Sequence, residues 1–182
     1  TRRSSDLIAV RIIAGAVFVG LLLGGILINE YTFCIIFSLI TVLSLYEFYG
    51  LIEKGAKVPL TRVWNVLGGF SLFIGSFYYY TVDASVVTFV PYCIYILVLF
   101  VGELYLKRPD PIRSIAYSLL GQFYIAVPFA LTNYLVFAYT PGSYHYVYVL
   151  ALLVFIWVND SFAYLTGMTF GKHRLFERIS PK

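Results

Sequence analysis

The sequence predicts an all-α, polytopic transmembrane protein with about six helical spans, and three observations support this prediction. Hydrophobic residues make up 60% of the 182-residue chain and charged residues only 12%, a balance that would leave a soluble domain with large exposed apolar patches. The chain holds 17 Tyr and 16 Phe, and aromatic rings are favoured at the two membrane interfaces. Apolar runs of about 20 residues, the length that crosses a bilayer as a helix, recur along the chain.

Six apolar segments qualify as spans, and short turns separate them. They are expected at residues 7–28, 31–52, 64–82, 84–106, 114–137 and 145–167. Each helix can satisfy its own backbone hydrogen bonds inside the bilayer. The connections then alternate between the two membrane faces. Residues 1–167 are expected to form one transmembrane helical domain, followed by a basic segment at 168–182.

The Lys and Arg residues predict the orientation of these spans. All 13 of them fall at the N-terminus, in the second and fourth connections or in the tail: Arg2, Arg3, Arg11, Lys54, Lys57, Arg62, Lys107, Arg108, Arg113, Lys172, Arg174, Arg178 and Lys182. The positive-inside rule therefore places both termini in the cytoplasm. The net charge of +4 is spread over short loops, which argues against nucleic-acid binding and favours anionic lipid or phosphate.

Three carboxylates lie within the predicted spans, where ionisable groups are expensive and therefore candidates for function. They are Glu47, Glu103 and Asp160. All three fall in the cytoplasmic halves of even-numbered spans, so they could converge at one depth. Two have structural alternatives: Glu103 precedes Lys107 by four residues, the favourable order for a helical ion pair, and Glu47 is close enough to the boundary to reach water or a loop Arg.

Asp160 has no basic residue at helical spacing, and its surroundings suit a binding role. Asp160, Ala163, Tyr164 and Gly167 share one helix face, where the small residues leave room beside the carboxylate. Mg²⁺ typically takes one or two protein carboxylates and fills its other positions with water and phosphate oxygens. The pattern therefore predicts a Mg²⁺ site at the cytoplasmic interface that needs a second acidic group.

The basic tail ends in a pattern typical of a helix start. Ser180 followed by Pro181 has the form of an N-cap and first helical residue. A helix N-terminus with an adjacent Lys, here Lys182, is a phosphate-binding arrangement. A simpler alternative is that the tail cations fix the topology and contact lipid headgroups.

At these residues the sequence resembles the phosphatidate cytidylyltransferase, or CDP-diacylglycerol synthase, family. The resemblance rests on residues 159–164 (Asn-Asp-Ser-Phe-Ala-Tyr), Gly167, residues 170–173 (Phe-Gly-Lys-His) and residues 179–182 (Ile-Ser-Pro-Lys). This motif covers the last quarter of the chain, and Phe162 stands where the family would have a small residue. The family continues beyond Ser-Pro-Lys, so the resemblance implies the N-terminal portion of a longer enzyme, inactive without its C-terminal catalytic region.

The resemblance implies transfer of CMP from CTP to phosphatidate, forming CDP-diacylglycerol and pyrophosphate in phospholipid biosynthesis. It assigns Asp160 to catalysis through a Mg²⁺ site, with a second metal ion left open, and Lys172, Ser180 and Lys182 to the CTP phosphates. Glu47, Glu103 and Tyr164 are further candidates. The expected location is a bacterial inner membrane with the active site facing the cytoplasm, and a homodimer stays open.

Two other functions stay open at the level of the sequence. The first is a small transporter or channel in which Glu47, Glu103 and Asp160 form a proton or cation path. Such a path requires acidic residues on both sides of the midplane, whereas these three cluster toward one side. The second is a non-catalytic membrane scaffold whose acids pair with loop cations.

Overall fold

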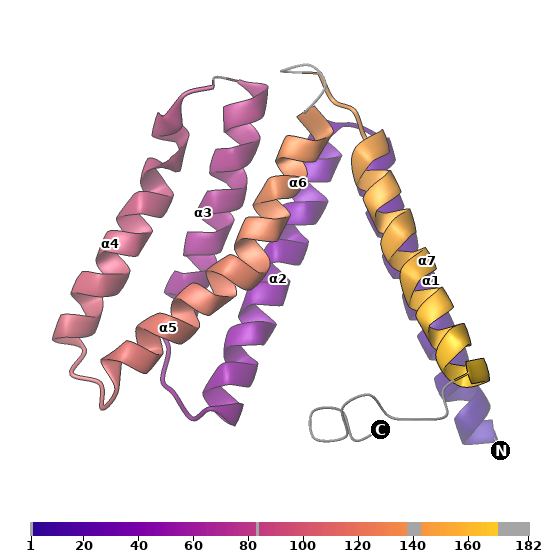
Figure 1. Cartoon of the computed structure of the whole chain (residues 1–182), viewed down its shortest axis with the longest axis horizontal. Coiled ribbons are helices and arrows are strands. Elements are labelled where there is room, and N and C mark those ends of the chain that lie inside the picture. Colours follow the sequence, from indigo (N-terminus) through magenta and orange to yellow (C-terminus); the bar gives the residue numbers. More distant parts are fainter. Residues whose placement is uncertain (1, 83, 138–142, 171–182) are drawn as a thin grey trace.

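The computed structural model describes residues 2–82, 84–137 and 143–170, and it describes the side chains in these ranges except at residues 2–9, 11 and 170. All of the secondary structure in the described residues is helical. The elements in chain order are α1 (Arg2–Leu27), α2 (Glu30–Gly55), α3 (Arg62–Thr81), η1 (Val86–Phe89), α4 (Val90–Tyr105), α5 (Pro111–Gly121), η2 (Gln122–Ala126), α6 (Val127–Phe137) and α7 (Val147–Phe170). Figure 1 shows that η1 continues into α4, and that α5, η2 and α6 form one rod, so six rods run up and down.

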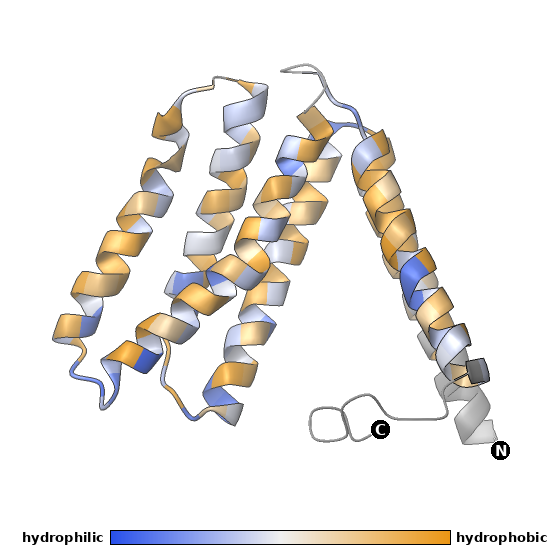
Figure 2. Ribbon diagram, viewed as in Figure 1, coloured by the Kyte–Doolittle hydropathy of each residue, from blue (hydrophilic) through white to orange (hydrophobic). Residues whose placement is uncertain are grey.

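The rods identify the chain as a polytopic membrane protein. Four of them are long and apolar enough to cross a bilayer: Glu30–Gly55, Val86–Tyr105, Pro111–Phe137 and Val147–Thr169; Ile12–Leu27 is a shorter apolar helix. Many large hydrophobic side chains of these rods are exposed, as expected where the surrounding solvent is lipid. Figure 2 shows that hydrophobic residues recur along all of the rods. The remaining rod, α3, packs against α2, α4 and α6. It can therefore carry polar residues that face protein.

Local sequence signals set where several helices begin. Asn29 caps α2 with a capping box, because its side chain accepts from the Thr32 N–H while the Thr32 hydroxyl accepts from the Asn29 N–H. Pro91 and Pro111 lie in the first turns of α4 and α5, where a missing N–H is tolerated. The rod formed by η1 and α4 therefore starts with a 3₁₀ turn at Val86. The rod that begins with α5 starts three residues before the span expected at 114–137.

The α2–α3 and α4–α5 loops lie at the same end of the bundle, which we call the basic end (Figure 1). It includes Lys54, Lys57, Arg62, Lys107, Arg108 and Arg113. The end formed by the α1–α2 and α3–η1 connections and the start of α7 is the opposite end. Lys57 and Lys107 follow the last turns of α2 and α4 with positive φ angles of 54° and 47°. Both loops therefore turn sharply after their helices.

Two buried clusters hold the rods together, one toward each end. The cluster at the opposite end joins α1, α2, α3, α6 and α7 through Leu22, Ile26, Phe33, Phe37, Phe73, Phe77, Val136, Phe137 and Val149. The cluster at the basic end joins α2, α3, the loop between them and η2 through Leu45, Tyr49, Val58, Leu60, Val66, Ile125 and Ala126. α2 and α3 both contribute to the two clusters, and α3 also packs against α4 and α6, which makes it the central helix of the bundle.

Tyr144 ties α1 to the start of α7 at the opposite end. Its hydroxyl donates to the Ile26 carbonyl over 2.7 Å, and its ring packs against Phe33 and Phe137. Burial and the nearby Glu30 carboxylate raise the pKa of Tyr144 above its usual range, so the hydroxyl stays protonated and can donate. α7 is thereby anchored at this end, beside α1 and α6.

Candidate functional site

Asp160 lies in the second half of α7, on a stretch of helix that is exposed throughout. Residues 154–169 are all exposed, and Figure 2 shows a hydrophilic patch in this otherwise largely hydrophobic half of the helix. Tyr164, one helical turn after Asp160, is 70% exposed. An ionised carboxylate facing lipid is unfavourable. This face of α7 therefore requires a polar partner, a ligand or another part of the protein to cover it.

The three span carboxylates do not come together. α7 leaves the bundle beside α1, while α2 and α4 belong to the other group of rods (Figure 1). Among the described residues there is no group of three or more His, Cys, Asp or Glu side chains that could hold a metal ion. The expected convergence of Glu47, Glu103 and Asp160 at one site is therefore not found in this part of the chain.

Glu47 is exposed on α2, and Arg62 contacts its neighbour in the chain, Tyr46, instead. The Arg62 guanidinium lies 3.3 Å from the centre of the Tyr46 ring, and its Nε donates to the Tyr46 carbonyl over 2.6 Å. This cation–π contact anchors α3 to α2. The structure thus gives Arg62 a role in packing α3 against α2. For Glu47, exposure is the one structural feature that favours ligand binding.

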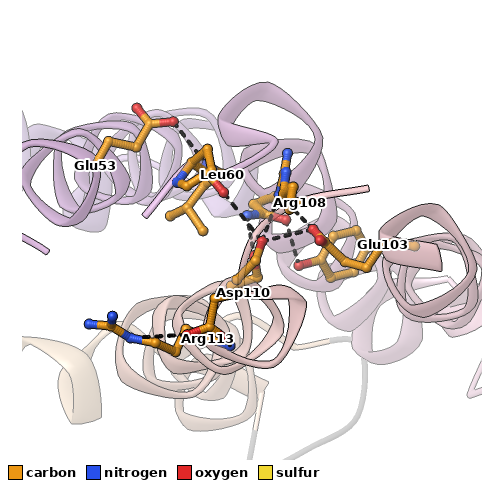
Figure 3. A network of polar contacts seen from close by, with 11 residues as sticks. Glu53, Leu60, Glu103, Arg108, Asp110 and Arg113 are labelled. Atoms are coloured by element: carbon orange, nitrogen blue, oxygen red, sulfur yellow. Dashed lines mark hydrogen bonds and ion pairs between the residues drawn. The ribbon is translucent and has the colours of Figure 1, made fainter. Parts of the chain in front are cut away.

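Glu103 is buried and forms an ion pair, but with Arg108 and not with the expected Lys107. It is 4% exposed, and its Oε1 accepts from Arg108 Nη1 over 2.5 Å (Figure 3). The helical i,i+4 geometry assumed for Lys107 is lost because α4 ends at Tyr105 and Lys107 has a positive φ. The pairing prediction was therefore right about an ion pair and wrong about its cation.

Ser114 extends this pair into a link between the two basic loops. Its hydroxyl lies 2.8 Å from Glu103 Oε1, 2.6 Å from Arg108 Nη1 and 3.3 Å from the Pro59 carbonyl. Glu53, near the end of α2, accepts from the Leu60 N–H on the α2–α3 loop, and Asp110 caps α5 and lies 3.8 Å from Arg113 (Figure 3). Glu103 is thus a structural group that holds the basic end together.

A second buried polar network, which sequence reasoning missed, joins α2, α3, α4 and the α5–η2 rod. Its members are Tyr49, Asn65, Tyr95, Ser118 and Gln122. The Tyr49 hydroxyl donates to the Ser118 carbonyl over 2.7 Å, and Gln122 Nε2 donates to Tyr49 Oη and to the Asn65 carbonyl. Buried hydrogen bonds of this kind favour one arrangement of the helices, although Gln122 Oε1 has no partner among the described residues.

The π-helical turn η2 begins at Gln122, which belongs to this network. A Cβ at Gly121 would lie 2.5 Å from the Tyr49 hydroxyl oxygen, so only glycine lets α5 approach α2 this closely. π-turns inside helices often occur at functional sites, but here the turn presents Gln122 to helix contacts. The amides of Asn65 and Gln122 inside apolar spans were the signal in the sequence that could have identified these contacts.

The described residues fit Mg²⁺ only in part. Asp160 offers one exposed carboxylate, which is one of the one or two that Mg²⁺ typically takes from protein. Glu103 is committed to Arg108, and no cluster of further ligands exists among the described side chains. Lys172, Ser180 and Lys182, expected to bind phosphate, lie outside the described residues.

Comparisons with known proteins identify relatives of the chain. The family model for the cytidylyltransferase family matches residues 9–182, which includes the segment around Asp160. Over 35 residues the chain is 54% identical to phosphatidate cytidylyltransferase from Aquifex aeolicus (strain VF5). This match covers 19% of the chain and 14% of the relative. No solved structure matches the chain significantly.

Proposed function

Because the chain belongs to the cytidylyltransferase family, we propose that it takes part in transferring CMP from CTP to phosphatidate, which forms CDP-diacylglycerol and pyrophosphate. The observation that carries the proposal is Asp160, an exposed carboxylate inside an apolar membrane helix and within the family match. A membrane-embedded chain suits a lipid substrate. A carboxylate at its surface suits a reaction between phosphates that requires charge to be neutralised.

The reaction needs no protein nucleophile. A phosphate oxygen of phosphatidate attacks the α-phosphorus of CTP, a new P–O bond forms, and the bond to the β-phosphate breaks to release pyrophosphate. Catalysis can then rest on alignment and on compensation of phosphate charge. Mg²⁺, when bound, supplies part of that compensation. In this proposal Asp160 offers a carboxylate to the cation, while Lys172, Ser180 and Lys182 bind the CTP phosphates.

We expect the proposed site to lie on the same side of the membrane as the basic end. Asp160 belongs to the half of α7 that points away from the opposite end (Figure 1). The excess of Lys and Arg in the α2–α3 and α4–α5 loops places the basic end in the cytoplasm by the positive-inside rule, where CTP is available. A bacterial inner membrane with the site on its cytoplasmic face fits this arrangement, and a homodimer stays a proposal.

Isotope transfer tests the reaction in the full-length protein reconstituted into liposomes that contain phosphatidate. CTP labelled at the α-phosphate should transfer its label to the lipid fraction, and CTP labelled at the γ-phosphate should release labelled pyrophosphate in equal amount. Liposomes with phosphatidylcholine alone serve as the control. An α-label that stays in water with intact CTP would show that the protein does not catalyse this transfer.

The expectation of a further catalytic region beyond residue 182 stays a prediction. The intact mass of the protein purified from its native host tests it against the 20.7 kDa of the present chain. A larger mass supports the prediction, whereas a native protein of 20.7 kDa that performs the transfer contradicts it.

A further inference from the structure

A cavity of about 490 Å³ lies between α2 and α3 at the opposite end of the bundle. Glu30 and Tyr31, in the first turn of α2, line this cavity, and so do Phe70 and Thr81 of α3. The eleven-residue step along α3 from Phe70 to Thr81 corresponds to about 16 Å. This is about half of a bilayer core of about 30 Å, so the cavity has the depth of one leaflet.

A row of side chains on α3 separates this cavity from a second one. Phe70, Ile74 and Tyr78 are spaced four residues apart, so they share one helix face, and they line both cavities. The second cavity, of about 400 Å³, lies toward η1 and α4, where Thr88 and Pro91 line it. Phe70 and Tyr78 are themselves exposed. Two adjacent, largely apolar cavities on one lipid-facing surface match the two acyl chains of a phospholipid.

Glu30 brings a negative charge to the first cavity, and no described cation compensates it. Its side chain is half-buried and forms no ion pair with any described residue. Residues 12–53 and 63–106, which include the cavity lining on α2 and α3, contain no Lys or Arg. The dipole of α2 explains an acid in the first turn, but it does not explain the cavity beside that acid. The end of the cavity at Glu30 therefore favours a cation.

The lining around Glu30 favours an ammonium group on an amphiphile over a metal ion. Mg²⁺ and Ca²⁺ prefer several oxygen ligands, whereas Glu30 is the single carboxylate among the described residues that line this cavity. Tyr31 and Tyr78 line it as well and are exposed, and aromatic faces attract ammonium groups. Ile35 and Ile74 continue the lining with hydrocarbon, which accommodates acyl chains and not a hydrated ion.

We propose that the α2–α3 cavity binds phosphatidylethanolamine, with the ammonium group beside Glu30 and the acyl chains on the two sides of the row that begins at Phe70. A primary ammonium donates charge-assisted hydrogen bonds to a carboxylate, whereas the trimethylammonium of phosphatidylcholine has no N–H to donate. The site is separate from Asp160, which lies in the half of α7 that points away from this end (Figure 1). It does not depend on the reaction proposed above.

Native mass spectrometry of lipid adducts tests this proposal in the full-length protein. The delipidated protein in detergent is mixed with equal amounts of phosphatidylethanolamine and phosphatidylcholine that carry the same acyl chains. The two lipids have the same net charge and differ only in the methyl groups on nitrogen. We expect the first adduct to contain phosphatidylethanolamine about tenfold more often, the effect of one hydrogen bond to a charged group.

Two variants remove the two parts of the site. Glu30→Gln removes the charge and keeps the size of the side chain, while Ile35→Trp fills the cavity from an exposed position on α2. Each should give equal adducts of the two lipids at an unchanged melting temperature. The matched controls are Glu47→Gln, an exposed carboxylate further along α2, and Leu39→Trp, an exposed position one turn after Ile35 and outside the cavity lining. Both controls should keep the preference.

Equal adducts of the two lipids in the parent protein overturn the proposal, and so does a preference that survives in either Glu30→Gln or Ile35→Trp. Loss of the preference in Glu47→Gln as well would place the ammonium away from the cavity. A cavity covered by a second copy of the chain would give no lipid preference, together with a change in oligomer mass in Ile35→Trp. Both of these results also overturn the proposal.

Discussion

At the scale of single residues, Glu103 depends on Arg108 to be tolerated inside the bundle. Its side chain is 2% exposed, that of Arg108 is 11% exposed, and Glu103 Oε2 has no hydrogen-bond partner in the described residues. Removing the cation would leave a buried carboxylate with only the Ser114 hydroxyl beside it. A buried charge that loses its partner destabilises a protein far more than the loss of a surface pair.

We predict that Arg108→Ala lowers the free energy of unfolding by about 3 kcal/mol, measured by denaturant titration in mixed micelles. Lys107→Ala is the matched control, because it removes the neighbouring cation but breaks no ion pair among the described residues. Its effect should stay within about 0.5 kcal/mol. Equal losses in the two variants would restore Lys107 as the partner of Glu103.

The charged residues of the spans could be recognised from the sequence, but the side chains that surround them could not all be predicted. Glu103 was recognised as a member of an ion pair, but its true partner depends on a left-handed residue after α4. The Tyr49, Asn65 and Gln122 network was missed, because its contacts join residues far apart in sequence. The roles of Asp160, Lys172, Ser180 and Lys182 stay predictions.

At the scale of the helices, α3 is positioned by glycines that face its neighbours. At Gly75 the obstacle to a side chain is the Thr88 backbone carbonyl, whose oxygen lies 2.6 Å from the position that a Cβ would take. A backbone group cannot move aside as the end of a side chain can. The contact between α3 and η1 therefore requires glycine here.

Gly75→Ala should reduce the free energy of unfolding by about 1–3 kcal/mol, as expected for overpacking. Gly102→Ala should leave it unchanged or raise it by up to about 1 kcal/mol, because alanine favours helix and its Cβ meets nothing within 4 Å. Differential scanning fluorimetry of both variants in the same detergent measures the difference. A Gly75→Ala protein as stable as the parent would contradict the packing described for η1.

The existence of the helices was predictable, whereas their internal details were not. Apolar runs of membrane length indicated each rod, but the prolines in the first turns of α4 and α5 were not used, and the fifth span was expected to start three residues too late. The π-turn η2, which follows the close contact between Gly121 and Tyr49, was not foreseen. The exposed second half of α7 was not foreseen either, since hydropathy alone cannot distinguish a face covered by protein from one covered by lipid.

At the scale of the whole molecule, the fold arranges the charges into one basic end. The α2–α3 and α4–α5 loops meet there through Ser114 and Pro59, as the alternating connections predicted. The structure thus agrees with the charge pattern in the sequence. Which membrane face this end occupies is a prediction from the positive-inside rule.

Labelling of single cysteines on intact cells tests this orientation. In a background with Cys34→Ser and Cys93→Ser, Ala84→Cys reports the opposite end and Lys57→Cys reports the basic end; both native residues are exposed. A membrane-impermeant maleimide should label the first variant in intact cells and the second only after permeabilisation. The reverse pattern would place the basic end outside the cell.

We propose that Asp160 serves phosphate transfer, and a matched pair of carboxylate variants tests this role. In the full-length protein, Asp160→Asn should lower the rate of CDP-diacylglycerol formation by about 100-fold or more, with normal membrane insertion. Asp110→Asn should keep the parent rate, because asparagine caps a helix as well as aspartate does, and this exposed residue caps α5 and contacts only the exposed Arg113 besides. Parent-level turnover by Asp160→Asn would contradict the assignment of Asp160.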